Sequence, residues 1–193
     1  MNSTIKNTAM TNSRTHVLKN GEVLLVRPAG REDTAEVMEF FAAVFGQDNE
    51  MLAIYDESPE SFTMEALWRR LNRYQTANNG LLLTAWLDDK VIGIAEISCN
   101  MEAAGAYSGR VGVSVLADYR GRGIGSALMY SLIGWARNHP TLEMLTLSVP
   151  ADNRIARLLY EKTGFQEEGR LTKATQSADG QFIDAIMMYK FVK

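Results

Sequence analysis

The stretch "DYRGRGIGSALM", residues Asp118–Met129, places three glycines and two arginines within six residues, directly before an apolar pattern at helical spacing. The apolar positions that follow Gly123 share one face of a helix. A helix N-terminus exposes unpaired backbone N–H groups and carries a partial positive charge. Glycines let that backbone approach an anion without a Cβ in the way. The stretch therefore predicts a cradle for a phosphate or pyrophosphate, to which Ser126 adds a hydroxyl and Arg120 and Arg122 add positive charge.

Two familiar phosphate-binding loops do not fit this stretch. A P-loop needs G-K-S/T after its glycines, which is absent here. The G-x-G-x-x-G dinucleotide fingerprint also fails, because Gly121, Gly123 and Gly125 are followed by Leu128. The remaining alternative to a phosphate cradle is a strand-to-helix turn that contains glycine and two solvated arginines.

Length and composition limit the class of protein. With 193 residues, 46% hydrophobic and 22% charged, the chain fits one globular domain with a substantial core. A net charge of −3 without a basic stripe argues against nucleic acid as a partner. The single cysteine, Cys99, excludes an intramolecular disulfide and a CxxC site, so we expect no metal. Because no apolar run suits a signal peptide or a membrane span, we expect a cytoplasmic protein without membrane contact.

The order of the predicted elements indicates a mixed sheet flanked by helices. Residues 1–20 are rich in Asn, Thr and Ser and predict a flexible extension, followed by a single domain over residues 21–193. Apolar periodicity in that domain predicts the order β-α-α-β-β-β-α-β-α-β-β. Strands are predicted at residues 22–28, 81–87, 91–98, 110–116, 142–149, 165–171 and 183–191, and helices at about 32–45, 59–77, 124–138 and 153–163.

A second pattern, "NRIARLLYEKTGF" at Asn153–Phe165, is typical of a capped helix. The Asn153 side chain can accept hydrogen bonds from the first turn, and Gly164 is placed to end the helix. Tyr160 lies two turns after Asn153, on roughly the same face. The alternative interpretation of Tyr160, taken alone, is an aromatic residue that packs in the core. The stripe expected to be buried consists of Ile155, Leu158 and Leu159.

Together the two patterns resemble those of the Gcn5-related N-acetyltransferase (GNAT) family. The family pattern R/Q-x-x-G-x-G/A is matched by Arg120, Gly123 and Gly125. The predicted element order resembles the family fold over residues 22–191. The resemblance implies an α/β (α+β) GNAT fold, in which a mixed, mostly antiparallel twisted sheet is flanked by helices and a splayed strand pair binds acetyl-CoA. The later pattern N-x-x-A-x-x-L-Y-x-x-x-G-F is matched by Asn153, Ala156, Leu159, Tyr160, Gly164 and Phe165.

The resemblance also implies a role for each matching residue. Acetyl-CoA is the implied cosubstrate, and Asn153 would contact its pantetheine arm. Tyr160 is the implied general acid that protonates the departing CoA thiolate. The backbone of Val113, Ser114 and Val115 would pair with the pantetheine arm, and the Val115 N–H would stabilise the oxyanion. The implied pyrophosphate site consists of Arg120, Gly121, Arg122, Gly123, Ile124, Gly125 and Ser126.

A general base is indicated less directly. The strand before the glycine-rich stretch, "GRVGVSVL", contains no glutamate. Glu96, on the preceding strand in "GIAEISC", is the catalytic candidate, because a carboxylate within an apolar run needs a reason to be there. The alternatives are a side chain turned to water, a structural pair with an arginine, and proton removal through ordered water. Cys99 is expected to be a buried residue and not a nucleophile.

The charge distribution points to the kind of acceptor. Between Glu32 and Glu65 the chain has ten acidic residues and no Lys or Arg. Five of the ten lie in "DNEMLAIYDESPE", Asp48–Glu60, interleaved with apolar residues. Such a segment suits a cationic amine with an aliphatic body, although solvated helix faces are the alternative.

We therefore predict an acetyl-CoA-dependent N-acetyltransferase, of the acyltransferase class, for a small cationic amine such as a polyamine or a lysine-like amine. The C-terminal half also resembles the polyamine and ribosomal-protein branches of the family. The alternatives are a protein acetyltransferase for N-termini or lysines, and a non-catalytic regulator that binds acetyl-CoA. A homodimer is also expected, because the closing strands of such folds often pair across a dimer interface.

Overall fold

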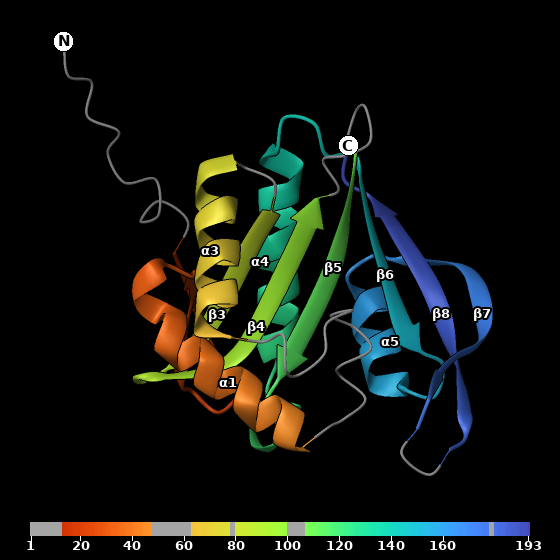
Figure 1. Ribbon diagram of the computed structural model, residues 1–193, viewed down its shortest axis with the longest axis horizontal. Coiled ribbons are helices and arrows are strands. Elements are labelled where there is room, and N and C mark those ends of the chain that lie inside the picture. Colours follow the sequence, from red (N-terminus) through yellow and green to blue (C-terminus); the bar gives the residue numbers. More distant parts are fainter. Residues whose placement is uncertain (1–12, 48–62, 78–79, 100–106, 178–179) are drawn as a thin grey trace.

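The structure is a computed structural model that describes residues 13–47, 63–77, 80–99, 107–177 and 180–193. These residues form an eight-stranded sheet in the order β1-β2-β3-β4-β5-β6-β8-β7. Helices α1 and α3 cover one face of the sheet and α4 covers the other (Figure 1). All neighbouring strands are antiparallel except β5 and β6, which are parallel. The mixed, mostly antiparallel sheet expected from the sequence is confirmed.

The predicted elements are all present in the predicted order, with one additional strand, β1, before them, and most element ends agree within a few residues. The start predicted for the second helix, near residue 59, lies outside the described residues. The strands are β1 (Arg14–Val17), β2 (Val23–Pro28), β3 (Gly80–Leu87), β4 (Lys90–Cys99), β5 (Ser108–Val115), β6 (Met144–Pro150), β7 (Gln166–Gln176) and β8 (Phe182–Phe191), and the helices are α1 (Thr34–Gln47), α3 (Met64–Ala77), α4 (Ile124–Asn138) and α5 (Arg154–Lys162).

Strand β1 lies in the segment that was predicted to be a flexible extension. It pairs antiparallel with β2, from Arg14↔Val26 to Val17↔Val23. Its side chains are mostly exposed, because it forms the edge of the sheet. Backbone pairing and not apolar burial therefore defines this strand, which is why hydrophobic periodicity did not predict it. The part of the extension that begins at Ser13 belongs to the folded sheet.

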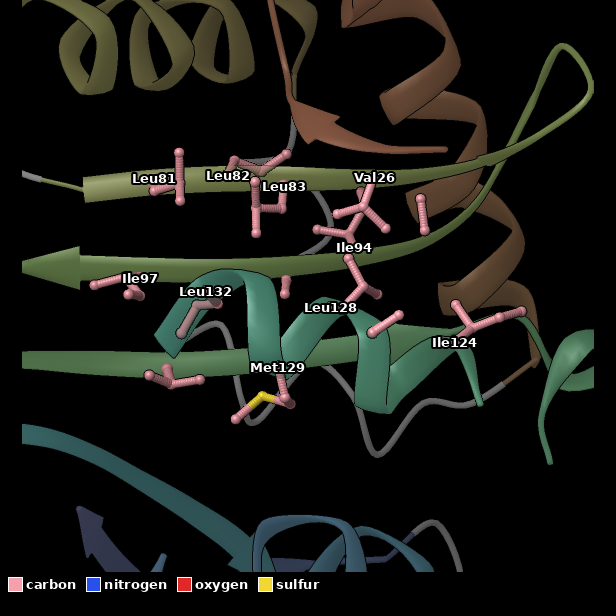
Figure 2. Packing of buried hydrophobic residues seen from close by; sticks show 14 of the residues in the cluster. Val26, Leu81, Leu82, Leu83, Ile94, Ile97, Ile124, Leu128, Met129 and Leu132 are labelled. Carbon is pink, nitrogen blue, oxygen red and sulfur yellow. The ribbon is translucent and has the colours of Figure 1, made fainter. Parts of the chain in front are cut away.

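The apolar core on one side of the sheet is closed by α4. Leu128 and Leu132 of α4 are fully buried and lie against the sheet strands (Figure 2). Gly93 of β4 allows this close packing, because a Cβ there would lie 3.1 Å from Leu128 Cδ1 and 3.2 Å from Ile124 Cγ2. The start of α4 is thereby held against β4, beside the end of β5. The helical face predicted from the glycine-rich stretch is the buried one.

A buried ion pair fixes the start of α1 on β2. The two terminal nitrogens of Arg27 donate to the two carboxylate oxygens of Asp33, each at 2.6 Å. Asp33 also accepts a hydrogen bond from the Gly30 N–H at 2.7 Å. The Arg27 guanidinium in turn lies over the Trp86 ring, 4.8 Å from its centroid. One carboxylate thus connects β2, the following turn and the first helix.

We predict that Asp33→Ala lowers the free energy of unfolding by about 3 kcal/mol, because it leaves the Arg27 guanidinium and the Gly30 N–H without their partner. Unfolding in urea measures this loss. The matched control is Glu65→Ala, because Glu65 pairs with Arg69 at 3.3 Å on the exposed surface of α3. Such exposed pairs contribute about 0.5 kcal/mol. Equal losses in the two variants would contradict the structural role of Asp33.

Candidate active site

Strands β5 and β6 are paired only at one end. Their parallel pairs run from Ser108↔Met144 to Arg110↔Thr146, and no further pair between them is present among the described residues. Beyond these pairs the two strands separate in Figure 1. The other edge of β5 is paired with β4 from Cys99↔Gly109 to Gly93↔Val115. The second half of β5 therefore has one free backbone edge, which faces a gap.

The free edge of β5 presents the polar backbone groups of Val113 and Val115. The Leu116 N–H donates to the Ile92 carbonyl of β4 at 3.0 Å. Because the backbone polar groups of successive residues in a strand point to opposite edges, those of Ser114 and Gly112 also face β4. Those of Val115 and Val113 point the opposite way, into the gap. In agreement, the Val115 carbonyl accepts a hydrogen bond from Arg120 Nε at 3.0 Å. These two valines therefore line the free edge of β5, and their pairing with the pantetheine arm stays a prediction.

Ser114, which was expected to act with the two valines, is placed differently. By the same alternation its backbone polar groups face β4, where it lies opposite Ile94. Its side chain is buried and lies on the face of the sheet opposite α4. In this geometry the Ser114 backbone pairs with β4 and not with a ligand in the gap, and the expected role of Ser114 at the pantetheine arm stays a prediction.

The glycine-rich stretch forms the turn from β5 to α4. Gly121 and Gly123 have φ values of +78° and +97°, a region that favours glycine. Gly123 is the N-cap of α4, and no side chain caps the helix. The Ala127 N–H donates to the Gly123 carbonyl at 3.1 Å as the first bond of the helix. The N–H groups from Ile124 to Ser126 therefore have no partner within the helix and are available to an anion.

Gly125 joins three parts of the predicted site. A Cβ at this position would lie 3.1 Å from Leu159 Cδ2 of α5 and 4.0 Å from Val115 Cγ2 of β5. Glycine here lets the start of α4, the end of β5 and α5 approach one another closely. The open helix start, the free strand edge and the helix that carries Tyr160 consequently meet at one place.

Helix α5 carries the two residues expected to act on the thioester arm. Asn153 caps the helix as predicted, with its Oδ1 accepting from the Ala156 N–H at 3.0 Å. Tyr160 is 5% exposed and packs edge-to-face on Phe165, with 5.9 Å between ring centroids. Burial raises the pKa of Tyr160 to about 12, so its hydroxyl is protonated at neutral pH. Among the described residues, none accepts a hydrogen bond from this hydroxyl.

The stripe predicted to be buried on α5 is wrong in two of its three members. Ile155 is 80% exposed and Leu158 is 53% exposed, whereas Leu159 is half-buried against the core. The helix packs through a neighbouring face that includes Ala156 and Tyr160. Because α5 has only nine residues, a small rotation about its axis is enough to exchange which apolar side chains are covered.

Glu96 lies between β4 and α3. Its side chain is buried, accepts a hydrogen bond from the Tyr74 hydroxyl, and has Oε1 3.7 Å from Arg70 Nη1. Burial, followed by the charge of Glu96, raises the pKa of Tyr74 above its usual range, so Tyr74 stays a donor. The structural pair with an arginine, which the sequence left open, is therefore present. On β5 the partner of Glu96 is Gly112, the residue before Val113, so the carboxylate lies one strand from the free edge.

Cys99 and His139 are two further residues of reactive type, and both are part of the folded core. Cys99 is buried, and burial raises the pKa of its thiol to about 11, which makes it a poor nucleophile at neutral pH. His139 is also buried, and its Nδ1 accepts a hydrogen bond from the Leu142 N–H at 3.2 Å in the turn between α4 and β6.

The acidic segment Asp48–Glu60, which pointed to a cationic acceptor, lies outside the described residues. Of the other acids counted with it, Asp33 is buried in the ion pair with Arg27, and Glu65 pairs with Arg69. These two acids have structural or surface partners of their own and do not add to the argument for a cationic acceptor.

Comparison with known proteins places this geometry in a family. The sequence profile of the acetyltransferase (GNAT) family matches residues 49–165. The L-amino acid N-acetyltransferase AaaT of Escherichia coli (strain K12) is 30% identical over 106 residues, which cover 55% of this chain and 65% of that enzyme, less than two thirds of its length. An acetyltransferase of the GNAT family from Streptococcus pneumoniae has a TM-score of 0.80 at 28% identity, over 88% of this chain and 99% of its own. The ribosomal-protein-alanine N-acetyltransferase from Brucella melitensis has a TM-score of 0.73 at 25% identity, over 86% and 98% of the two chains.

The chain belongs to the acetyltransferase (GNAT) family, because the family profile matches more than half of it. Members of this family use acetyl-CoA, and several other similar structures hold acetyl-CoA or CoA. The expected family and fold class are thus confirmed, and the N-acetyltransferase class and the cosubstrate acetyl-CoA are those of this family. None of the described helices has the length and apolar character needed to cross a membrane.

Proposed function

We propose that this protein transfers the acetyl group of acetyl-CoA to the primary amine of a small acceptor at the gap between β5 and β6. The observation that carries the proposal is the meeting of three features at Gly125: the free edge of β5, the uncapped start of α4, and α5. Each feature suits a different part of the same ligand. The helix start suits the pyrophosphate, the strand edge suits the amide groups of pantetheine, and Tyr160 suits the sulfur.

The residues of the gap account for the charges that develop during transfer. The amine nitrogen attacks the thioester carbonyl carbon, and negative charge forms on the carbonyl oxygen, within reach of a backbone N–H of Val115 or Val113. The C–S bond then breaks, and the Tyr160 hydroxyl gives its proton to the leaving sulfur, forming the free thiol of CoA. The amine loses one proton as the C–N bond forms, and Tyr160 regains a proton from solvent after the thiol has formed.

Glu96 remains our candidate for receiving the proton of the attacking amine. Its position opposite Gly112 supports this role, because glycine places no side chain between the carboxylate and the free edge at that register. The hydrogen bond from Tyr74 and the pair with Arg70 hold the carboxylate in one place. Since the Glu96 side chain is buried, we propose that the proton reaches it through an ordered water and not by direct contact with the amine.

Two acceptor classes have support. The five acidic residues within Asp48–Glu60 favour a small cationic amine, such as a polyamine or a lysine-like amine. The similarity to an L-amino acid N-acetyltransferase favours an α-amino acid as the second candidate. A cytoplasmic location and a homodimer, both expected from the sequence, stay predictions.

The proposal is tested by measuring the release of the CoA thiol from acetyl-CoA in the presence of each amine of a panel. The panel contains a polyamine, lysine, neutral and acidic amino acids, and a peptide that begins with alanine, the residue named for the Brucella melitensis enzyme. We expect turnover on a cationic small amine with a kcat/KM at least about 10-fold above that for neutral amino acids. Preference for neutral or acidic amino acids would contradict the cationic acceptor, and turnover on the peptide alone would identify a protein acetyltransferase. Saturable acetyl-CoA binding without turnover on any amine would indicate a regulator.

A further inference from the structure

We infer that Glu22, at the turn between β1 and β2, weakens the pyrophosphate site by occupying Arg122. The inference rests on the proposed function, because it takes the glycine-rich stretch to bind the pyrophosphate of acetyl-CoA. Glu22 is about 100 residues from that stretch in the sequence, and only the pairing of β1, β2 and the central strands brings the two together.

Three contacts hold the Arg122 guanidinium in place. Nη1 lies 3.4 Å from Glu22 Oε2, and Nη2 donates to the Asp118 carbonyl at 2.9 Å. The Cζ atom lies 5.0 Å from the centroid of the Tyr119 ring. The carbonyl and the ring belong to the same turn as Arg122 and are neutral. Glu22 is therefore the partner that neutralises the arginine.

The Glu22 carboxylate is held toward Arg122 by its own turn. Its Oε2 accepts a hydrogen bond from the Asn20 side-chain amide, and its backbone N–H donates to Asn20 Oδ1 at 3.2 Å. The Leu18 N–H donates to the Glu22 carbonyl at 2.9 Å, which closes the hairpin. A fixed negative charge therefore stands beside the turn that precedes α4.

That charge opposes an anionic ligand in two ways. Arg122 immediately precedes Gly123, the N-cap of α4, so an anion at the helix start would compete with Glu22 for the guanidinium. The carboxylate would also repel the anion directly. Both side chains are more than a third exposed, so the effect is moderate and falls with added salt.

The affinity of the protein for CoA, measured by titration calorimetry at low ionic strength, tests the inference. Glu22→Gln removes the charge and keeps the shape of the side chain, and we expect it to lower Kd about two- to five-fold. Because Glu22 acts mainly through Arg122, the same change in an Arg122→Gln background is expected to lower Kd less than about two-fold, through the loss of direct repulsion alone. The control for net charge is Glu143→Gln, since Glu143 lies just before β6, beyond the far end of the 15-residue α4, about 20 Å from the glycine-rich turn.

A probe without the pyrophosphate separates the site from the rest of the ligand. S-acetyl-pantetheine has the thioester arm alone, and we expect its KM to be the same for wild type and Glu22→Gln. The inference is overturned if Glu22→Gln leaves Kd for CoA unchanged or raises it, if Glu143→Gln lowers Kd equally, or if the effect of Glu22→Gln is as large without Arg122 as with it. If the wild type does not bind CoA, the proposed function fails, whereas wild-type binding that Glu22→Gln does not tighten refutes the inference alone.

Discussion

Tyr160→Phe is expected to lower kcat about 100-fold while changing Kd for CoA less than about two-fold. The substitution removes the proton donor for the leaving sulfur and keeps the ring that packs on Phe165. The fold is expected to survive, because no described residue accepts a hydrogen bond from the Tyr160 hydroxyl. Thiol release on the best amine of the panel measures kcat. Unchanged kcat in a folded variant would remove Tyr160 from the mechanism.

The pH dependence of the same reaction gives a second readout of Tyr160. Burial raises the pKa of Tyr160 to about 12, so the acid form persists through neutral and moderately alkaline pH. Loss of the acid would begin only as the pH approaches that value. We therefore expect that loss of the Tyr160 proton does not lower wild-type kcat between about pH 7 and pH 10. Any fall in kcat over this range is expected in Tyr160→Phe as well. A falling limb near pH 8 that disappears in the variant would contradict the protonated state assigned here.

Glu96→Gln is expected to lower kcat/KM about 100-fold and to destabilise the fold by about 2 kcal/mol. The activity falls because the amide does not accept a proton from the amine. The stability falls because Arg70 loses the carboxylate with which it pairs. Thiol release and urea unfolding measure the two effects.

A matched variant separates catalysis from folding for Glu96. Arg70→Met breaks the same ion pair from the other side and leaves the carboxylate in place. We expect this variant to be destabilised to a similar degree but to keep most of the activity, with the acidic limb of its pH profile shifted upward because the carboxylate has lost a cation. Equal losses of activity in the two variants would assign Glu96 a structural role only.

The parts of the site that follow local rules were predictable from the sequence. The glycines of the turn and the Asn153 cap each depend on neighbouring residues, and both are present in the structure. Tyr160 followed from a motif resemblance, and the structure places it on α5, whose Leu159 contacts the start of α4 at Gly125.

The parts that depend on tertiary register were not predictable. Along β5, the backbone polar groups of successive residues point alternately to β4 and to the gap. Those of Ser114 therefore face β4 while those of its neighbours face the gap, and only the pairing with β4 defines which residues face which side. Tyr74 and Arg70 reach Glu96 from α3, a helix more than 20 residues earlier in the sequence. The contact between Glu22 and Arg122 depends on a β1–β2 hairpin whose first strand has no apolar pattern.

A crystal structure of the protein with CoA is the decisive experiment for the proposed site. We expect the pyrophosphate on the backbone N–H groups between Gly121 and Ser126, the pantetheine arm paired with Val113 and Val115, and the sulfur within hydrogen-bond reach of the Tyr160 hydroxyl. CoA bound away from the gap between β5 and β6, or a sulfur far from Tyr160, would contradict it.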